Sequence, residues 1–151
     1  MSFGQALIFT LQEEGGYVAN PSDDGGATCH GVTQRTYDAY RLSLNLPSRS
    51  VADIQDPEAR DIYQRMYWGP AGCDALPDAL GICHFDWAVN HGVAGAKTTL
   101  LQTVGDWRAY NQLRRTWYRV RVEARPDQEV FLKGWLGRVD RLDAYVEGLN
   151  R

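Results

Sequence analysis

The feature that most constrains this 151-residue chain is a segment near its middle whose apolar residues lie on every side of a helix. Between Pro77 and Gly92 they recur without a polar stripe, at Leu80, Ile82, Cys83, Phe85, Trp87, Ala88 and Val89. A helix that is apolar all round is usually buried on all sides. We therefore expect it at the centre of the fold, with Asn90 and His91 at its C-terminal end.

Amphipathic patterns predict further helices on both sides of this segment. A first helix holds Phe3, Ala6, Leu7 and Leu11 at helical spacing and should end at Gly15-Gly16, which places Glu14 in its last turn. Thr33 should cap a second helix, which runs to about Leu44. Later helices are expected from an N-cap at Asp56, followed by Pro57, to Trp68-Gly69-Pro70; from Val93 to Val104; from a cap at Asp106 to Ala124; and from Pro126 to Leu149.

The same spacing predicts which residues face the core. The expected inward faces are Ala59, Ile62, Tyr63, Met66 and Tyr67; then Leu113, Trp117, Val120 and Ala124; then Leu136, Val139, Leu142, Val146 and Leu149. Residues 17–33 are polar and rich in Gly and Asp, which favours an irregular β-hairpin with its turn near Asp24-Gly25-Gly26. The sequence thus predicts a mainly α (α+β) single domain with a small β-hairpin after the first helix.

Charge and cysteine content exclude several classes of protein. The net charge of −3 argues against a broad polyanion-binding face, so nucleic acid is not an expected partner. Cys29, Cys73 and Cys83 are odd in number and lack CxxC spacing, so we expect reduced, packing cysteines. His30, His84 and His91 lack metal-ligand spacing, and we expect neither a metal nor a cofactor.

The chain shows no pattern for crossing or entering a membrane. No segment reaches the ~20 apolar residues of a membrane span, and the first residues do not read as a secretory signal. We expect synthesis in the cytoplasm, a monomer, and no stable membrane insertion.

Two carboxylic acids stand close to the glycine-rich stretch after the first helix. Glu14 precedes Gly15-Gly16-Tyr17, and Asp23 follows before Gly25-Gly26-Ala27-Thr28. Two carboxyl groups facing one another are what glycosidic bond hydrolysis needs, one to protonate the leaving oxygen and one to activate water or stabilise positive charge. Asp and Gly are also common in ordinary turns, so spacing alone leaves the role of Asp23 and Asp24 open.

These motifs resemble those of the N-acetylmuramidases of glycoside hydrolase family 108. The resemblance rests on Glu14-Gly15-Gly16-Tyr17, Asn20-Pro21, Gly25-Gly26-Ala27-Thr28, Gly31-Val32-Thr33, Tyr67-Trp68, Asp74-Ala75-Leu76-Pro77, the block from Phe85 to Gly92, Leu101-Gln102 and the block from Phe131 to Val139. It implies a lysozyme-like fold and cleavage of the bond between N-acetylmuramic acid and N-acetylglucosamine in bacterial peptidoglycan. It also divides the domain into a signature region, about 1–92, and a helical region, about 93–151, that resembles a peptidoglycan-binding segment. We expect this second region to be a wall of the single domain.

The resemblance also implies roles for individual residues. Glu14 becomes the catalytic glutamate, and Glu14, Asp23 and Thr28 resemble the catalytic triplet of phage-type lysozymes. Tyr17, Tyr67 and Trp68 are candidates for stacking on sugar rings, with a place in the core as the alternative for the last two. Asn90 and His91 either cap their helix or contact an N-acetyl or hydroxyl group.

Three activities remain open at this point. The leading hypothesis is a peptidoglycan hydrolase; the alternatives are a non-catalytic wall-binding or secretion-accessory protein and a lytic transglycosylase, which uses one acid and no water. Inverting and retaining chemistry are both compatible with the residues. Because the substrate lies beyond the cytoplasmic membrane, we expect a holin or a secretion system to deliver the protein to the periplasm or cell wall.

Overall fold

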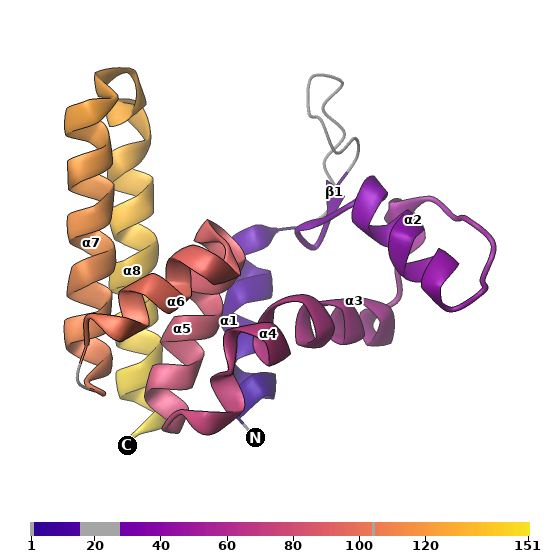
Figure 1. Cartoon of the computed structure of the whole chain (residues 1–151), viewed down its shortest axis with the longest axis horizontal. Coiled ribbons are helices and arrows are strands. Elements are labelled where there is room, and N and C mark those ends of the chain that lie inside the picture. The colour runs from indigo at the N-terminus through magenta and orange to yellow at the C-terminus, as the bar shows by residue number, and fades with distance from the viewer. Residues whose placement is uncertain (1, 16–27, 104) are drawn as a thin grey trace.

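The computed structural model describes residues 2–15, 28–103 and 105–151, and its helices surround one central helix, α5 (Asp78–His91). Every residue from Leu80 to Ala88 is buried, which confirms the prediction from the all-round apolar pattern. α5 packs against α1 (Ser2–Glu14), α6 (Val93–Leu101), α7 (Trp107–Ala124) and α8 (Glu129–Leu149) (Figure 1). It ends at Gly92, whose φ of +105° suits a residue without a side chain.

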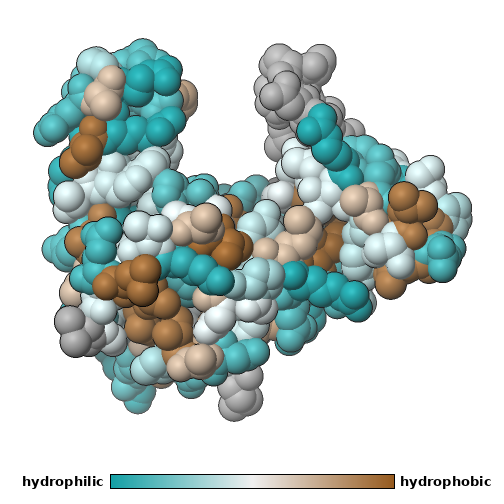
Figure 2. Space-filling view, in the orientation of Figure 1, coloured by the Kyte–Doolittle hydropathy of each residue, from teal (hydrophilic) through white to brown (hydrophobic). Residues whose placement is uncertain are grey.

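Two helical walls rise on either side of this centre. α7 and α8 form an antiparallel pair joined by a 3₁₀ turn, Pro126–Gln128. On the other side lie α2 (Gln34–Ser43), a 3₁₀ turn at Val51–Asp53, and α3 (Asp56–Tyr63). The space-filling view is hollowed between the α7–α8 wall and the side of the molecule that carries β1 and the α2–α3 wall, and the C-terminal end of α1 lies at the floor of this hollow (Figures 1 and 2).

A small antiparallel hairpin follows α1, as predicted. β1 (Thr28–Cys29) pairs with β2 (Val32–Thr33), with Thr28 opposite Thr33. The turn is therefore His30-Gly31, both with positive φ. The predicted turn at residues 24–26 lies outside the described residues.

The helix after residue 55 departs from the expected helix at both ends. Its N-cap is Gln55, not Asp56, because Gln55 forms a capping box with Glu58. Gln64–Trp68 form a π turn, which inserts an extra residue and rotates the side chains that follow. Met66 is consequently 43% exposed and not part of the core. The helix continues through α4 (Gly69–Ala71), where Pro70 lies in the first turn and its missing N–H costs little, and stops only at Gly72.

The predicted inward face of α7 is wrong except at Trp117, which is half-buried and packs against the core. Asp106 caps the helix as expected, but Val120 is 55% exposed. The buried residues are instead Trp107, Tyr110, Asn111, Arg114 and Tyr118. Apolar periodicity cannot find such a face, because half of it is polar and is buried only through partners on other helices. In α8 the predicted inward face is confirmed at Val139, Leu142 and Val146, which are buried, whereas Leu149 is 39% exposed.

A buried carboxylate connects the four helices that meet at the centre. Asp86 of α5 has no solvent exposure, and its Oδ1 accepts hydrogen bonds from Thr10 Oγ1 of α1 at 2.9 Å and from Arg138 Nη2 of α8 at 2.8 Å. Its Oδ2 accepts from Arg114 Nη1 of α7 at 2.7 Å and from Arg138 Nε at 3.1 Å. Burial acts to raise the pKa of Asp86, but Arg114 and Arg138 outweigh it and lower the pKa to about 2. We call Asp86, Thr10, Arg114 and Arg138 the Asp86 hub.

The cysteines take part in packing. Cys29, Cys73 and Cys83 are free and buried, as expected for reduced core residues. In the described ranges no helix is both long and apolar enough to cross a membrane.

Replacement of Asp86 tests how far the fold depends on the hub. In Asp86→Ala, Arg114 stays fully buried and loses its carboxylate, so the free energy of unfolding should fall by about 3–5 kcal/mol. The measurement is urea denaturation followed by circular dichroism. Asp140→Ala is the control, because its side chain is 69% exposed and pairs only at the surface. Similar urea midpoints for both variants would contradict this account.

Candidate functional site

Glu14 lies in the last turn of α1, at the floor of the hollow. Gly15 follows with a φ of +77°, and its N–H closes the helix on Leu11 O at 3.1 Å, so the chain leaves the helix directly after the carboxylate. The Glu14 side chain is 23% exposed, and its Oε1 lies 3.0 Å from Arg138 Nη1. Glu14 is therefore accessible to a ligand while one oxygen is held by a cation.

Arg138 joins Glu14 to the Asp86 hub. Burial acts to lower the pKa of the Arg138 guanidinium, but the carboxylates of Asp86 and Glu14 outweigh it and raise that pKa. Arg138 is thus a permanent cation whose direction is set by its two bonds to Asp86. The side chain is only 11% exposed, so solvent screens its attraction to Glu14 weakly.

The turn of the hairpin packs directly on Glu14. Gly31 has a φ of +75°, and a Cβ at this position would lie 3.0 Å from Glu14 Cβ and 3.1 Å from Glu14 Cγ. It would also collide with the hydroxyl of Tyr63, which donates a hydrogen bond to His30 O. Gly31 is therefore required twice, for its backbone conformation and for the close approach to the acid.

Two tyrosines of the α3–π segment lie close enough to Glu14 to be affected by its charge. Burial raises the pKa of Tyr63, and the charge of Glu14 adds to the shift, so the hydroxyl keeps its proton and remains a donor. Burial, followed by the charge of Glu14, also raises the pKa of Tyr67, whose ring centroid lies 5.7 Å from that of Tyr63. Tyr67 is half-buried, so a part of it stays accessible, as a substrate-contacting residue requires.

The structure corrects the prediction that Trp68 stacks on a sugar ring. Its side chain is 2% exposed and packs on Phe3 and Phe85, while its indole Nε1 donates to Asp74 Oδ1 at 2.7 Å. No ring face is left for a sugar. The π turn explains this placement, because it rotates the residue next to Tyr67 into the core.

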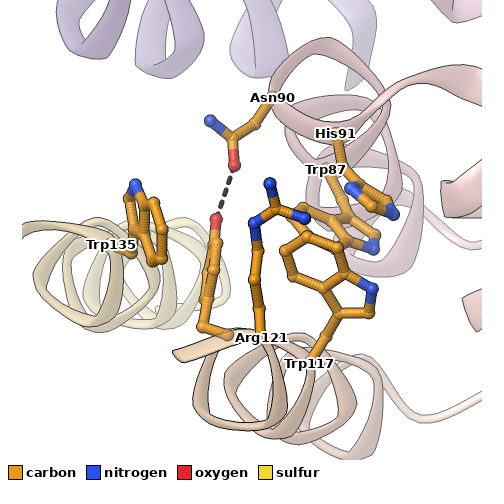
Figure 3. Close-up of a pocket in the computed structure, with 7 residues that line it drawn as sticks. Trp87, Asn90, His91, Trp117, Arg121 and Trp135 are labelled. Atoms are coloured by element: carbon orange, nitrogen blue, oxygen red, sulfur yellow. Dashed lines mark hydrogen bonds between the residues drawn. The ribbon is translucent and has the colours of Figure 1, made fainter. Parts of the chain in front are cut away.

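Asn90 and His91 line a pocket of about 310 Å³ between α5, α7 and α8 (Figure 3). The other lining residues are Trp87, Trp117, Tyr118, Arg121 and Trp135. The His91 ring stacks on Trp87 with centroids 4.1 Å apart, and burial is the first cause that lowers the pKa of His91. The cap of α5 is Gly92, so neither Asn90 nor His91 has the simple capping role.

The remaining predicted site residues are placed only in part. Thr28 begins β1 and is half-buried, in the hairpin whose turn covers Glu14. Tyr17, Asp23 and Asp24 lie outside the described residues. Glu13, the neighbour of Glu14, pairs with Arg141, with Arg141 Nε 2.6 Å from Glu13 Oε1 and the Glu13 side chain 15% exposed. Within the described ranges, no group of His, Cys, Asp and Glu side chains is arranged to hold a metal ion.

Several residues of this region escaped the sequence reasoning. Asp86, Arg114 and Arg138 hold Glu14 in place directly or through one another. Two of them carried a signal that could have been used: Asp86 is an acid inside an otherwise apolar helix, and Arg138 stands next to Val139 on the inward face of α8. A charge at a core position is rare unless it is paired, so its presence indicates a partner.

A pair of glycine substitutions separates the close approach at Gly31 from backbone strain. Gly31 and Gly72 have φ of +75° and +74°, but nothing lies within 4 Å of a Cβ at Gly72. Gly72→Ala should cost about 1–2 kcal/mol of folding free energy from the left-handed conformation alone. Gly31→Ala should cost clearly more, because its methyl group also meets Glu14 and Tyr63. Equal losses in chemical denaturation would show that the contact is unimportant.

Comparison with known proteins agrees with this arrangement. The sequence model of the Glycosyl hydrolase 108 family matches residues 7–92, which is more than half of the chain. The solved structure of Brucella abortus SagA is similar, with a TM-score of 0.69 and 26% sequence identity over 99% of this chain and 95% of that chain. No curated protein matches the sequence significantly. With its lysozyme-like fold, the chain belongs to the glycosyl hydrolase 108 family and is a glycosidase that degrades peptidoglycan.

Proposed function

We propose that this protein is an N-acetylmuramidase, which hydrolyses the β-1,4 bond between N-acetylmuramic acid and N-acetylglucosamine with Glu14 as the general acid. The observation that carries the proposal is the position of Glu14. Its carboxyl group is part-exposed in the hollow and is bound to a buried, oriented cation, Arg138. A residue at an ordinary helix end would have no need of this support.

The cluster beside Glu14 carries a positive charge in a fixed position. Asp86 carries one negative charge, and Arg114 and Arg138 carry two positive charges between them. Without Glu14 this cluster has one positive charge in excess, and Arg138 Nη1 lies 3.0 Å from Glu14 Oε1. Arg138 therefore stabilises charge that develops during bond cleavage, in a position fixed beforehand.

The shape of the molecule suits a polymeric substrate. A glycan strand is long, and an enzyme that cleaves within it needs a groove open at both ends. The hollow between the α7–α8 wall and the α2–α3 wall provides such a passage, with the end of α1 at its floor (Figure 2). Tyr67 on one side and Asn90 and His91 on the other are proposed to contact the sugars.

The second catalytic group is proposed to be Asp23, with Thr28 holding the attacking water. Thr28 belongs to the same hairpin that places Gly31 against Glu14, which supports a location near the acid. An anion at Asp23 would stabilise the positively charged sugar or activate water. The separation of the two carboxyl groups would then determine inversion or retention, at ~6.5–9.5 Å or ~5–5.5 Å respectively.

Substitution of Glu14 tests the role of the acid. Glu14→Gln should leave the fold intact and reduce peptidoglycan hydrolysis by about 10²–10⁴-fold, because an amide cannot protonate the leaving oxygen. Glu13→Gln is the matched control, since the same change one residue earlier breaks only the pair with Arg141. Activity of Glu14→Gln above a tenth of wild type would falsify the assignment.

The products identify the bond that is cleaved. Released fragments are reduced with borohydride and analysed by mass spectrometry. A muramidase leaves reduced N-acetylmuramic acid at the new ends. Reduced N-acetylglucosamine would identify a glucosaminidase, anhydro-muramic acid a lytic transglycosylase, and an absence of products a wall-binding protein; each of these three results contradicts the proposal.

Two neighbouring aspartates test the second acid. Asp23→Asn should lower kcat more than it raises KM, because the charge matters most when the sugar becomes cationic. Asp24→Asn, the adjacent and chemically identical change, should have the smaller effect. An unchanged kcat with a raised KM would instead make Asp23 a residue that positions substrate, as steady-state kinetics on soluble glycan strands can distinguish.

A further inference from the structure

The pocket between α5, α7 and α8 lies one helical turn from the groups that hold Glu14. Asn90 follows Asp86 by four residues on α5, and Trp135 precedes Arg138 by three residues on α8. Residues three or four apart lie on the same side of a helix. A ligand group in this pocket would therefore be next to the sugar whose bond faces Glu14.

The pocket contains a cation that is not neutralised by a carboxylate. Among the described residues, no Asp or Glu forms an ion pair with Arg121, whereas Arg115 in the middle of α7 and Arg125 at its C-cap each have acidic partners. Arg121 is held by its Nε bond to Gln128 Oε1 at 2.6 Å and lies over the Trp117 ring, 5.4 Å from the centroid. Its guanidinium projects toward Asn90 and His91 (Figure 3). The two Nη groups are thus placed to bind an anion.

Asn90 adds an oriented amide beside this cation. Its Oδ1 accepts a hydrogen bond from the Tyr118 hydroxyl and lies 3.5 Å from Arg114 Nη2. These contacts fix the amide so that the carbonyl is used and the Nδ2 donors remain for a ligand. Asn90 can therefore donate to a carboxylate or carbonyl oxygen.

Aromatic rings enclose the polar groups. Trp117 and Trp135 are half-buried on opposite sides of the pocket, and Trp135 stacks on Tyr118 with centroids 5.1 Å apart. Such surfaces suit apolar carbon–hydrogen groups and exclude water, which strengthens a charge-assisted bond to Arg121. His91 contributes a flat surface against Trp117, at a centroid distance of 4.3 Å.

We propose that this pocket binds a carboxylate on the lactyl arm of muramic acid, and so makes the enzyme selective for an anionic glycan over a neutral one. Arg121 would bind the carboxylate with its paired N–H groups, and Asn90 would donate a further bond. The lactyl arm is the part that distinguishes muramic acid from N-acetylglucosamine. The carboxylate is either that of the arm itself or one in the peptide attached to it. The inference rests on the proposed muramidase function.

Three substrates distinguish the sources of the carboxylate. They are peptide-bearing glycan, glycan stripped of peptide by an amidase, which exposes the lactyl carboxylate, and stripped glycan whose carboxyl groups have been reduced to alcohols. Binding is measured by calorimetry in the Glu14→Gln background, so that the result does not depend on hydrolysis or on which bond is cut. A failure of the muramidase assignment would then appear in the products and not in these affinities.

Arg121→Gln is the main variant. It should weaken binding of carboxylate-bearing glycan by about tenfold or more, as expected for the loss of hydrogen bonds to a charged group, and leave binding of the reduced glycan unchanged. Arg125→Gln is the matched control, since Arg125 lies four residues away and pairs with Asp127 at the surface. Circular dichroism checks that each variant is folded.

The pattern across substrates decides the proposal. A loss confined to stripped glycan supports it with the lactyl carboxylate as ligand, because that carboxyl group is amide-bonded in peptide-bearing glycan. A loss confined to peptide-bearing glycan supports it with a peptide carboxylate, and a loss on both supports it with either carboxylate as ligand. The proposal also makes a prediction for the protein that keeps Arg121. This protein must bind reduced glycan more weakly than it binds peptide-bearing glycan, stripped glycan or both. Equal affinity of that protein for all three glycans, or an equal loss on all three in Arg121→Gln, would overturn it.

Discussion

The bonding of Asp86 is the interaction on which the rest of this structure depends. One carboxylate without solvent exposure accepts hydrogen bonds from Thr10, Arg114 and Arg138, and so ties α5 to α1, α7 and α8. Removal of a carboxylate from water costs several kcal/mol, which only a complete set of partners can offset. All four helices must therefore be in place before the charge is satisfied, and this links the packing of the core to the geometry of the site.

Glu14, the proposed catalytic acid, is held by the same bonds. Arg138 reaches Glu14 from the hub, while Gly31 packs on it from the hairpin, so Glu14 lies between a charged support and a steric one. Buried ion networks add little net stability, because desolvation offsets their attraction. We interpret the Asp86 hub as a means of orienting Arg138. It fixes a cation at the place where the proposed acid acquires negative charge, at a modest cost to the stability of the domain.

The positions at which apolar periodicity predicted the wrong burial are concentrated near this site. α7 buries Asn111, Arg114 and Tyr118, whereas apolar periodicity predicted Val120 and Ala124 on its inward face. The polar groups of α7 can be buried because they form hydrogen bonds with partners on α5 and α8. The π turn at Gln64–Trp68 exposes Met66, buries Trp68 and leaves Tyr67 beside Glu14. A π turn has no strong signature in composition, and it re-aims every side chain after it.

The sequence by itself determined the central helix, the other helices of the domain to within a few residues and the free cysteines, and it made Glu14 the leading candidate for the acid. These follow from local properties: the period of apolar residues, the glycines that stop helices, and motifs that keep their order along the chain. Only the tertiary structure decided that Asp86, Arg114 and Arg138 form one hub, that the hairpin turn is His30-Gly31, and that Arg121 shares a pocket with Asn90. These facts depend on contacts between segments far apart in the chain, where the cost of burying a charge is decided by partners that no local pattern contains.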